Sequence, residues 1–177
     1  MIPSFVIHSS TSNTRDGFVN TLVKETGSTV FDAIMTVDGK DGCRQSHIAV
    51  AKLSKQSHPT SHYLVFEDDC ILSENWQQVL KGYEFADVLY LGYNDKCNKA
   101  VFGTHALYLS PKARDVIIEG AERYKDRVEN KGAYDWILSL LCRKYGLITC
   151  MPKMENKDLF CHQAKDVVSL ITGQTRK

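Results

Sequence analysis

Short apolar runs alternate along this chain with amphipathic segments. An apolar run of about four to eight residues is typical of a strand buried on both faces of a sheet. We expect strands at residues 4–8, 30–37, 63–66, 88–91, 105–109 and 147–151. The amphipathic segments repeat apolar residues every three or four positions, which predicts helices that cover a sheet. We expect helices at residues 14–26, 43–56, 74–85 and 133–145, with a further one after residue 110.

Several residues mark where these elements begin and end. Gly27 and Gly146 each follow a helical pattern, and glycine is the preferred residue just past a helix C-terminus. Ser110 followed by Pro111 predicts a helix start, with serine as the cap and proline in the first turn. The pair Asp38-Gly39 predicts a turn after the second strand.

Strands separated by helices predict an α/β fold with a mostly parallel sheet and helices on both faces. The 177 residues fit a single domain spanning 1–177, with a tail after about residue 172 that we expect to be frayed. Ligands of such sheets bind outside the carboxyl ends of the strands. The run Glu67-Asp68-Asp69 directly follows the apolar run 63–66, so the sequence places an acidic cluster at such an end.

Composition narrows the range of functions. The formal net charge is +1, which gives no field that would attract nucleic acid. The N-terminus has no basic leader, and no run approaches the ~20 apolar residues of a membrane span. The six cysteines form no CxxC pair, so we expect reduced, mostly buried thiols and a cytoplasmic protein without an integral membrane segment.

The acidic cluster suggests a metal site. Side chains alternate in an extended segment, which would place Glu67 and Asp69 on one side and Asp68 on the other. Two carboxylates on one face suit Mg²⁺ or Mn²⁺, hard cations that prefer oxygen ligands and bridge to phosphate oxygens. The alternative is a solvated acidic turn without a metal.

An ordered series of motifs resembles one family. It comprises Phe31-Asp32-Ala33, Asp38-Gly39, Gly42-Cys43-Arg44-Gln45-Ser46-His47, the strand ending in Glu67-Asp68-Asp69, Val88–Gly92, Gly103–Ser110 and Tyr134-Asp135-Trp136. The series is similar to the motifs of glycosyltransferase family 25, which includes lipooligosaccharide glycosyltransferases and relatives that galactosylate collagen. The chain departs from that family in a short spacer before Gly42 and in its compactness, and both departures concern the acceptor site more than the donor site.

The resemblance implies a GT-A fold, a UDP-type sugar donor such as UDP-galactose, a divalent metal, a glycan acceptor and inversion at the anomeric carbon. It implies that Asp69 binds the metal, that Glu67 supports the ribose or the metal, and that Asp68 acts behind them. Asp135 stands at the family's position for a general base, although a carboxylate in the first turn of a helix also has an ordinary structural role. GT-A enzymes often recruit a late histidine as a metal ligand, so His162 is a candidate, with a partly exposed histidine as the alternative.

Further residues are candidates for the donor pocket. His8 and Ser9 occupy the carboxyl end of the first strand, where a nucleotide base usually sits in this fold. Arg15 suits a phosphate because a guanidinium matches its geometry in a bidentate way, and a surface salt bridge is the alternative.

The helix expected at 43–56 adds the pair Ser46 and His47, which point about 100° apart and so do not form a nucleophile–base pair. We expect His47 to be a buried, hydrogen-bonded support of the donor pocket, and Cys43 to lie in the core. Asp38 is a further candidate because the pair Asp38-Gly39 belongs to the series of motifs that resembles family 25.

Other functions compete with this interpretation. A nucleotidyltransferase would be expected to carry a glycine-rich basic loop near the N-terminus, and residues 8–16 are rich in Ser and Thr instead. A metal phosphohydrolase would use more clustered His and Asp ligands. The alternative that is not an enzyme is a binding module, a transferase fold that retains nucleotide or glycan binding without turnover.

Overall fold

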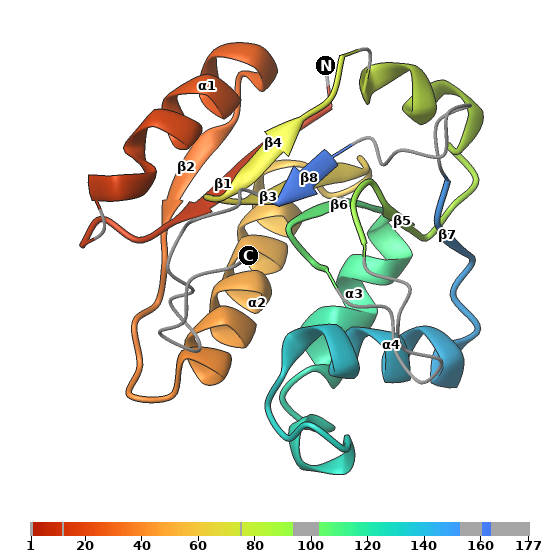
Figure 1. The fold of residues 1–177 in the computed structure, drawn as a ribbon. Helices are drawn as coiled ribbons and strands as arrows, with labels where there is room; N and C mark the ends of the chain where they lie inside the picture. Colours follow the sequence, from red (N-terminus) through yellow and green to blue (C-terminus); the bar gives the residue numbers. More distant parts are fainter. Residues whose placement is uncertain (1, 12, 75, 94–102, 153–160, 164–177) are drawn as a thin grey trace.

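The computed structural model describes residues 2–11, 13–74, 76–93, 103–152 and 161–163. A six-stranded sheet with the order β2-β1-β3-β6-β5-β7 forms its centre (Figure 1). The strands are β1 (Ser4–His8), β2 (Thr29–Asp32), β3 (Tyr63–Glu67), β5 (Val88–Tyr90), β6 (Ala106–Leu109) and β7 (Thr149–Cys150). All pairings are parallel except those of β6 with β3 and β5. The mostly parallel α/β sheet predicted from the sequence is confirmed.

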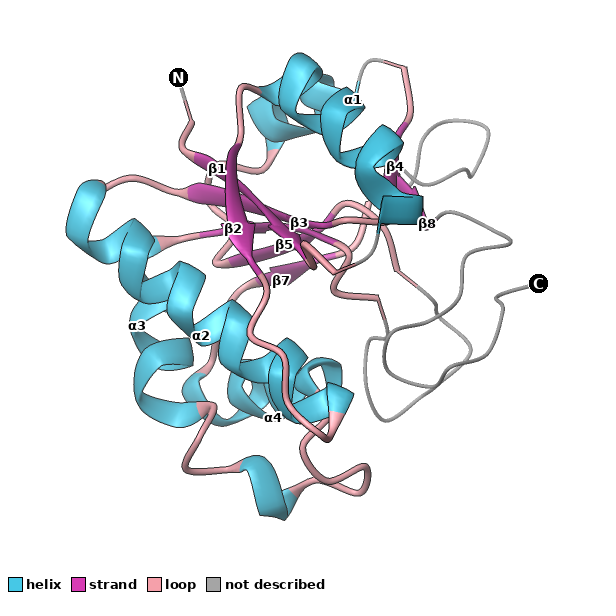
Figure 2. Ribbon diagram, turned by 90° about the vertical axis from the view of Figure 1, so that its left-hand side faces the viewer, coloured by secondary structure: helices cyan, strands magenta, loops and turns pink. Residues whose placement is uncertain are grey.

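Helices cover both faces of this sheet (Figure 2). On one face lies α1 (Asp16–Thr26), and on the other lie α2 (Gly39–Ser57), α3 (Pro111–Gly120) and α4 (Tyr134–Tyr145). Two buried apolar clusters result, one on each side of the sheet. Neighbouring residues of β3 show why its sequence is apolar throughout: Val65 joins the cluster beneath α2 to α4, and Leu64 and Phe66 join the one beneath α1.

The expected helix ends are present. Gly27 and Gly146 adopt the left-handed conformation, with φ of 67° and 59°, which an L side chain rarely adopts. The Ser110 hydroxyl accepts a hydrogen bond from the Ala113 N–H at 3.1 Å, and Pro111 occupies the first turn of α3. These local signals therefore fix where the helices stop and start.

The segment around Asp38 differs from the expectation. Strand β2 ends at Asp32 rather than at residue 37, and α2 begins at Gly39 rather than at Cys43. Asp38 does not form a turn between them but caps α2, its carboxylate accepting a hydrogen bond from the Lys40 N–H at 3.0 Å. Residues 33–38 are therefore a loop leading directly into the helix.

Contacts with α2 explain why this loop leaves the sheet. The Ile34 N–H donates to the Ser46 hydroxyl at 2.9 Å, so a backbone group of the loop is satisfied by the helix instead of by a neighbouring strand. Gly42 allows this close approach, because a Cβ there would meet the Ile34 carbonyl oxygen at 2.5 Å. The loop and the first turns of α2 thus form one packed unit.

Short elements account for the remaining differences. The segment expected to be a helix at 74–85 contains a 3₁₀ helix, η2 (Trp76–Gly82), and two further short 3₁₀ helices are η1 (Asn13–Arg15) and η3 (Lys125–Arg127). A small antiparallel sheet of β4 (Cys70–Leu72) and β8 (Cys161–Gln163) was not expected. Three residues give too short a pattern to predict a strand.

Five of the six cysteines lie within the described residues, and all five are free thiols, as expected. The sixth, Cys97, and the tail after residue 172 lie outside those residues. Among the described helices, none combines the length and the apolar character needed to cross a membrane.

Candidate functional site

The acidic run lies at the edge of the sheet where parallel strands end. Strands β1 and β3 are neighbours, with Ile7 opposite Glu67 in the register. Strand β3 ends at Glu67, and Asp68 and Asp69 stand in the turn that follows. The predicted location at a carboxyl edge is confirmed, and it is where ligands bind in folds of this type.

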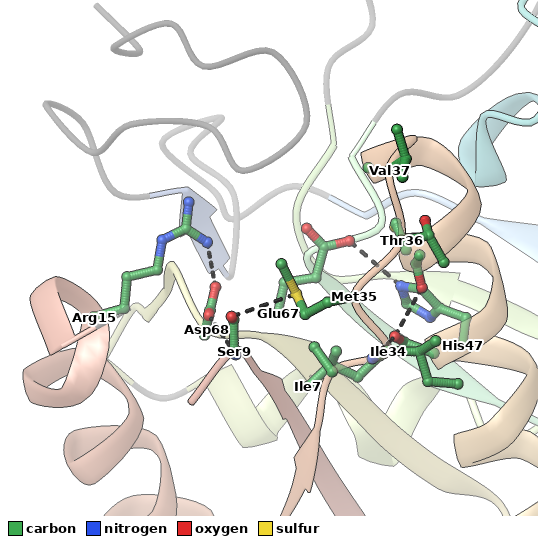
Figure 3. Close-up of a pocket in the computed structure, with 15 residues that line it drawn as sticks. Ile7, Ser9, Arg15, Ile34, Met35, Thr36, Val37, His47, Glu67 and Asp68 are labelled. Carbon is green, nitrogen blue, oxygen red and sulfur yellow. Dashed lines mark hydrogen bonds and ion pairs between the residues drawn. The ribbon is translucent and has the colours of Figure 1, made fainter. Parts of the chain in front are cut away.

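A cavity opens at this edge (Figure 3). Its walls come from the ends of β1 and β3, from the loop 33–37 and from the start of α2. The predicted site residues among its lining are Ser9, Arg15, Ser46, His47, Glu67 and Asp68. Residues far apart in the sequence therefore meet around one space, with Arg15 on one side and His47 on the other (Figure 3).

One side of the cavity, which we call the Arg15 side, is lined by Arg15, Asp68 and Ser9, with His8 in contact with Asp68. Arg15 is only 4% exposed and forms an ion pair with Asp68, so the salt bridge of the alternative interpretation is present but is buried rather than at the surface. The other Asp68 oxygen lies 3.1 Å from His8 Nδ1 and accepts a hydrogen bond from the Ser9 N–H at 3.3 Å. The Asp68 carboxylate is thus neutralised and fixed within the protein.

The turn after β3 changes the expected alternation of the acidic run. The same Arg15 nitrogen that pairs with Asp68 lies 3.6 Å from an Asp69 oxygen. The chain stops being extended at Glu67, so the alternation of side chains no longer applies to the two residues that follow, and Asp68 and Asp69 share one cation. Asp69 is fully buried.

The opposite side, which we call the Glu67 side, is lined by Glu67, His47 and Cys43, with Asp135 behind this wall and close enough to interact with their charges. The Glu67 carboxylate lies 3.4 Å from His47 Nε2 and accepts a hydrogen bond from the Thr104 hydroxyl at 2.8 Å. Burial alone would raise the pKa of Glu67, but the hydrogen bond and charge of His47 and the hydrogen bond from Thr104 outweigh it. They hold this pKa at about 2, so Glu67 is ionised at neutral pH.

His47 is buried and rigidly placed. Its ring stacks on that of Tyr134 at the start of α4, with centroids 4.1 Å apart and planes 15° from parallel. The prediction of a buried, hydrogen-bonded histidine is confirmed. Cys43 lies one helical turn earlier and lines the cavity at half-buried exposure, so it sits at the margin of the core rather than inside it.

The charges on the Glu67 side act on one another. Burial raises the pKa of the Cys43 thiol, and the carboxylates of Glu67, Asp135 and Asp69 raise it further. Burial likewise raises the pKa of Asp135 to about 6, with a further contribution from the charge of Glu67 and an opposing one from the Trp136 N–H. Asp135, in the first turn of α4, is therefore within electrostatic range of the cavity wall.

Of three other predicted residues, Ser46 lines the cavity, whereas Asp38 and His162 are not among its lining residues. The Ser46 hydroxyl, which lines the cavity, donates to the Gly42 carbonyl at 2.8 Å while it accepts from Ile34, so it holds the loop against α2. Asp38 is the exposed cap of α2. His162 is exposed and lies on β8. Its partner on β4 is Ile71, which follows Asp69 by two residues in the chain.

Sequence reasoning missed some partners of the acidic run. Thr104 and Tyr134 were quoted only as parts of motifs, and nothing in their spacing predicts that they would contact Glu67 and His47. Cys43 carried a usable signal, because residues four apart on a helix share a face with each other. Among the described residues, Cys43, His47 and Glu67 form the one group of three such side chains whose ligand atoms all lie within 4.8 Å of one another.

Comparison with known proteins shows what kind of fold this is. No family model and no curated protein sequence matches the chain. It is similar in structure to a glycosyltransferase involved in the glycosylation of the major capsid of PBCV-1, with a TM-score of 0.56, 9% identity, and coverage of 85% of this chain and 81% of that one. It is also similar to the glycosyltransferase GlyE of Streptococcus pneumoniae, with a TM-score of 0.50 and 10% identity.

The second similarity covers 86% of this chain but 46% of GlyE, so the chain spans less than half of that protein. At these identities the likeness concerns the fold alone. The fold of this chain is a GT-A-like glycosyltransferase fold, as the sequence predicted.

Proposed function

We propose that this chain is a glycosyltransferase that moves a sugar from a nucleotide-sugar donor to a hydroxyl group of a glycan acceptor. The observation that carries the proposal is the cavity at the carboxyl edge of β1 and β3, lined by a buried arginine and by an ionised glutamate, in a fold shared with glycosyltransferases. Charges of both signs at one edge suit a donor that has an anionic diphosphate and a polar sugar.

The Arg15 side is the proposed place for the nucleotide diphosphate. The Arg15 guanidinium lines the cavity, and a guanidinium matches the geometry of phosphate oxygens in a bidentate way. Ser9 and His8, at the end of β1, lie beside it for contacts with the nucleoside. The resemblance to family 25 supports a UDP-sugar, such as UDP-galactose, as the donor.

Mn²⁺ or Mg²⁺ would neutralise the diphosphate as it leaves. Glu67 fits this ion, because it is an ionised oxygen donor on the cavity wall. Asp69, the proposed second ligand, is fully buried beside Arg15, so its use requires that contact to open. His162 remains a proposed further ligand at the exposed edge of β8.

Asp135 is the proposed general base. In an inverting transfer, the acceptor oxygen bonds to the anomeric carbon on the face opposite the diphosphate, while the bond from that carbon to the diphosphate oxygen breaks. The acceptor's proton passes to the Asp135 carboxylate. A pKa of about 6 suits this role, since the group is ionised at neutral pH and still basic enough to take the proton.

A thermal-unfolding panel tests the donor site. The purified chain is heated with UDP, GDP, CMP and their sugars, each with and without Mn²⁺. A ligand that binds only the folded state at ~100 Kd stabilises it by about 2.7 kcal/mol. We expect a rise in Tm with uridine nucleotides that is larger with Mn²⁺, followed by release of UDP when acceptors are added. A shift without turnover on any acceptor would support the binding module, and no shift at millimolar ligand would overturn the donor site.

A further inference from the structure

The Glu67 side contains two side chains, Cys43 and His47, that the proposed transfer reaction does not use, and they lie beside one that it does use, Glu67. Cys43 and His47 lie one turn apart on α2, and Glu67 comes to them from the end of β3. A thiol, an imidazole and a carboxylate thereby offer one ligand atom each, all within 4.8 Å of one another. Metal sites in proteins are built from side chains of these three types.

The spacing of two of these atoms already suits a metal ion. Ligand atoms bound at about 2.0–2.2 Å to a tetrahedral Zn²⁺ lie roughly 3.3–3.6 Å apart. His47 Nε2 and the Glu67 carboxylate are 3.4 Å apart. The Cys43 Sγ lies within 4.8 Å of both, so a movement of about 1 Å would bring it to the same ion at its longer Zn–S distance of about 2.3 Å.

Neighbouring groups hold these ligands in place. The His47 ring stacks on Tyr134, and Thr104 donates a hydrogen bond to the same Glu67 oxygen that faces His47. Such outer contacts orient metal ligands in known sites, and their loss typically costs about 10–100-fold in metal affinity. The charges of Glu67, Asp135 and Asp69 around Cys43 favour a cation at this position, and the more weakly acting Arg44 guanidinium opposes it.

The ligand types select the metal. A thiolate is a soft ligand that favours Zn²⁺, whereas Mg²⁺ and Mn²⁺ prefer oxygen. Sites with three protein ligands keep a fourth position open, in contrast to closed structural sites with four. Cys43, His47 and Glu67 all line the cavity, so the fourth position would face the space that takes the ligand.

We propose that Cys43, His47 and Glu67 form a three-ligand Zn²⁺ site whose fourth position opens into the cavity. On binding, the Cys43 thiol loses its proton to solvent and the thiolate becomes a ligand. The site does not depend on the proposed sugar transfer. Because Glu67 is shared with the proposed donor metal, Zn²⁺ bound here would compete with Mn²⁺ for that carboxylate.

Cobalt provides a direct test, since Co²⁺ substitutes for Zn²⁺ and a thiolate bound to it gives a charge-transfer absorption. We expect the intact chain to bind one Co²⁺ with that absorption and to release it when Zn²⁺ is added, without any nucleotide present. Cys43→Ser should abolish the absorption and weaken Zn²⁺ binding by more than about 100-fold, because a direct ligand matters more than an outer contact. The matched control, Cys150→Ser, alters another half-buried free thiol and should change neither.

A measurement on the unaltered chain guards against a variant that fails to fold. Alkylation followed by mass spectrometry should show Cys43 protected by Zn²⁺, while Cys150 reacts at the same rate with and without the ion. Absorption that persists in Cys43→Ser, or Cys43 alkylation that Zn²⁺ does not slow, would overturn the site. Neither readout involves a nucleotide, so the donor panel fails or succeeds separately.

Discussion

The two sides of the cavity hold adjacent carboxylates in different ways. On the Arg15 side, Asp68 faces a buried guanidinium, which carries a permanent positive charge. On the other side, Glu67, which directly precedes Asp68 in the chain, contacts the imidazole of His47 and the hydroxyl group of Thr104. Neighbours in one acidic run therefore have partners of different chemical character, and they face opposite walls of the same space (Figure 3).

This difference separates two tasks within the acidic run. A carboxylate already neutralised by arginine has little attraction left for a metal ion, so Asp68 serves to position Arg15. A carboxylate held by His47 and Thr104 keeps its charge and faces groups that titrate or bind metals. We therefore expect anion binding on the Arg15 side, and cation binding and proton transfer on the Glu67 side. The predictions below test this division on the scale of unfolding free energy, from the largest effect to the smallest.

Arg15→Met should be the most damaging change. It leaves the buried Asp68 and Asp69 without their shared cation, and removal of one partner of a buried ion pair costs about 3–5 kcal/mol. Urea unfolding at neutral pH measures the loss. The double variant with Asp68→Asn removes one of the two stranded charges and should recover part of it. A double variant less stable than Arg15→Met would show that Asp68 does not depend on Arg15.

Glu67→Gln should have a smaller, pH-dependent effect. Because the folded-state pKa is about 2 instead of 4.5, the ionised form is favoured in the folded protein. We expect the variant to be about 1–2 kcal/mol less stable at pH 7, below the limit of about 3 kcal/mol for the full pKa difference. The stabilisation is present above pH 4.5 and is lost as the pH falls towards 2, so the difference should shrink in acid. A difference independent of pH would mean that packing, rather than charge, is responsible.

Asp135→Asn should stabilise the folded protein while it abolishes activity. The Asp135 pKa is raised to about 6, so ionisation is harder in the folded state than in the unfolded one. The wild-type chain therefore loses stability as the pH rises from about 4 through 6. The variant does not, because the asparagine side chain does not ionise. Since Asp135 is half-buried, we expect a gain of about 1 kcal/mol above pH 6.

Turnover provides the second readout for Asp135. Loss of a general base typically lowers the rate about 10²–10⁴-fold. Urea unfolding at pH 5 and pH 8 together with a UDP-release assay measures both effects. A variant less stable than wild type at pH 8 would show that the charge serves the N-terminus of α4 instead of the cavity.

The sequence was sufficient to predict where the acidic run lies in the sheet but not which side chains contact it. The apolar run 63–66 ending in acidic residues predicts a buried strand with carboxylates at its carboxyl end, because the pattern is local and strong. The helix ends at Gly27 and Ser110 were predictable for the same reason. The turn after β3, which brings both Asp68 and Asp69 close to Arg15, could not be predicted. Side chains alternate between the two faces only while the chain stays extended.

Long-range packing decides the rest. Asp38 followed by Gly39 fits a turn and a helix cap equally well, and the contact of Ser46 with the loop at Ile34 settles the choice. The approach of Glu67 to His47 and Thr104 joins three separate parts of the chain. The four-residue spacing of Cys43 and His47 was visible in the sequence, but their third partner was not, because it depends on where α2 crosses the end of β3.

Cys43→Ser should have the smallest effect on the metal-free protein and a selective effect with zinc. Cys43 is half-buried at the cavity wall, so the isosteric change should alter the unfolding free energy by less than about 1 kcal/mol. With Zn²⁺ at ~100 Kd, the wild-type chain should gain about 2.7 kcal/mol, and the variant should gain far less at the same concentration. Cys150→Ser, tested beside it in thermal unfolding with and without the ion, should gain as much as wild type. Equal zinc stabilisation of Cys43→Ser would place the cation elsewhere and would remove the chemical contrast between the two sides of the cavity.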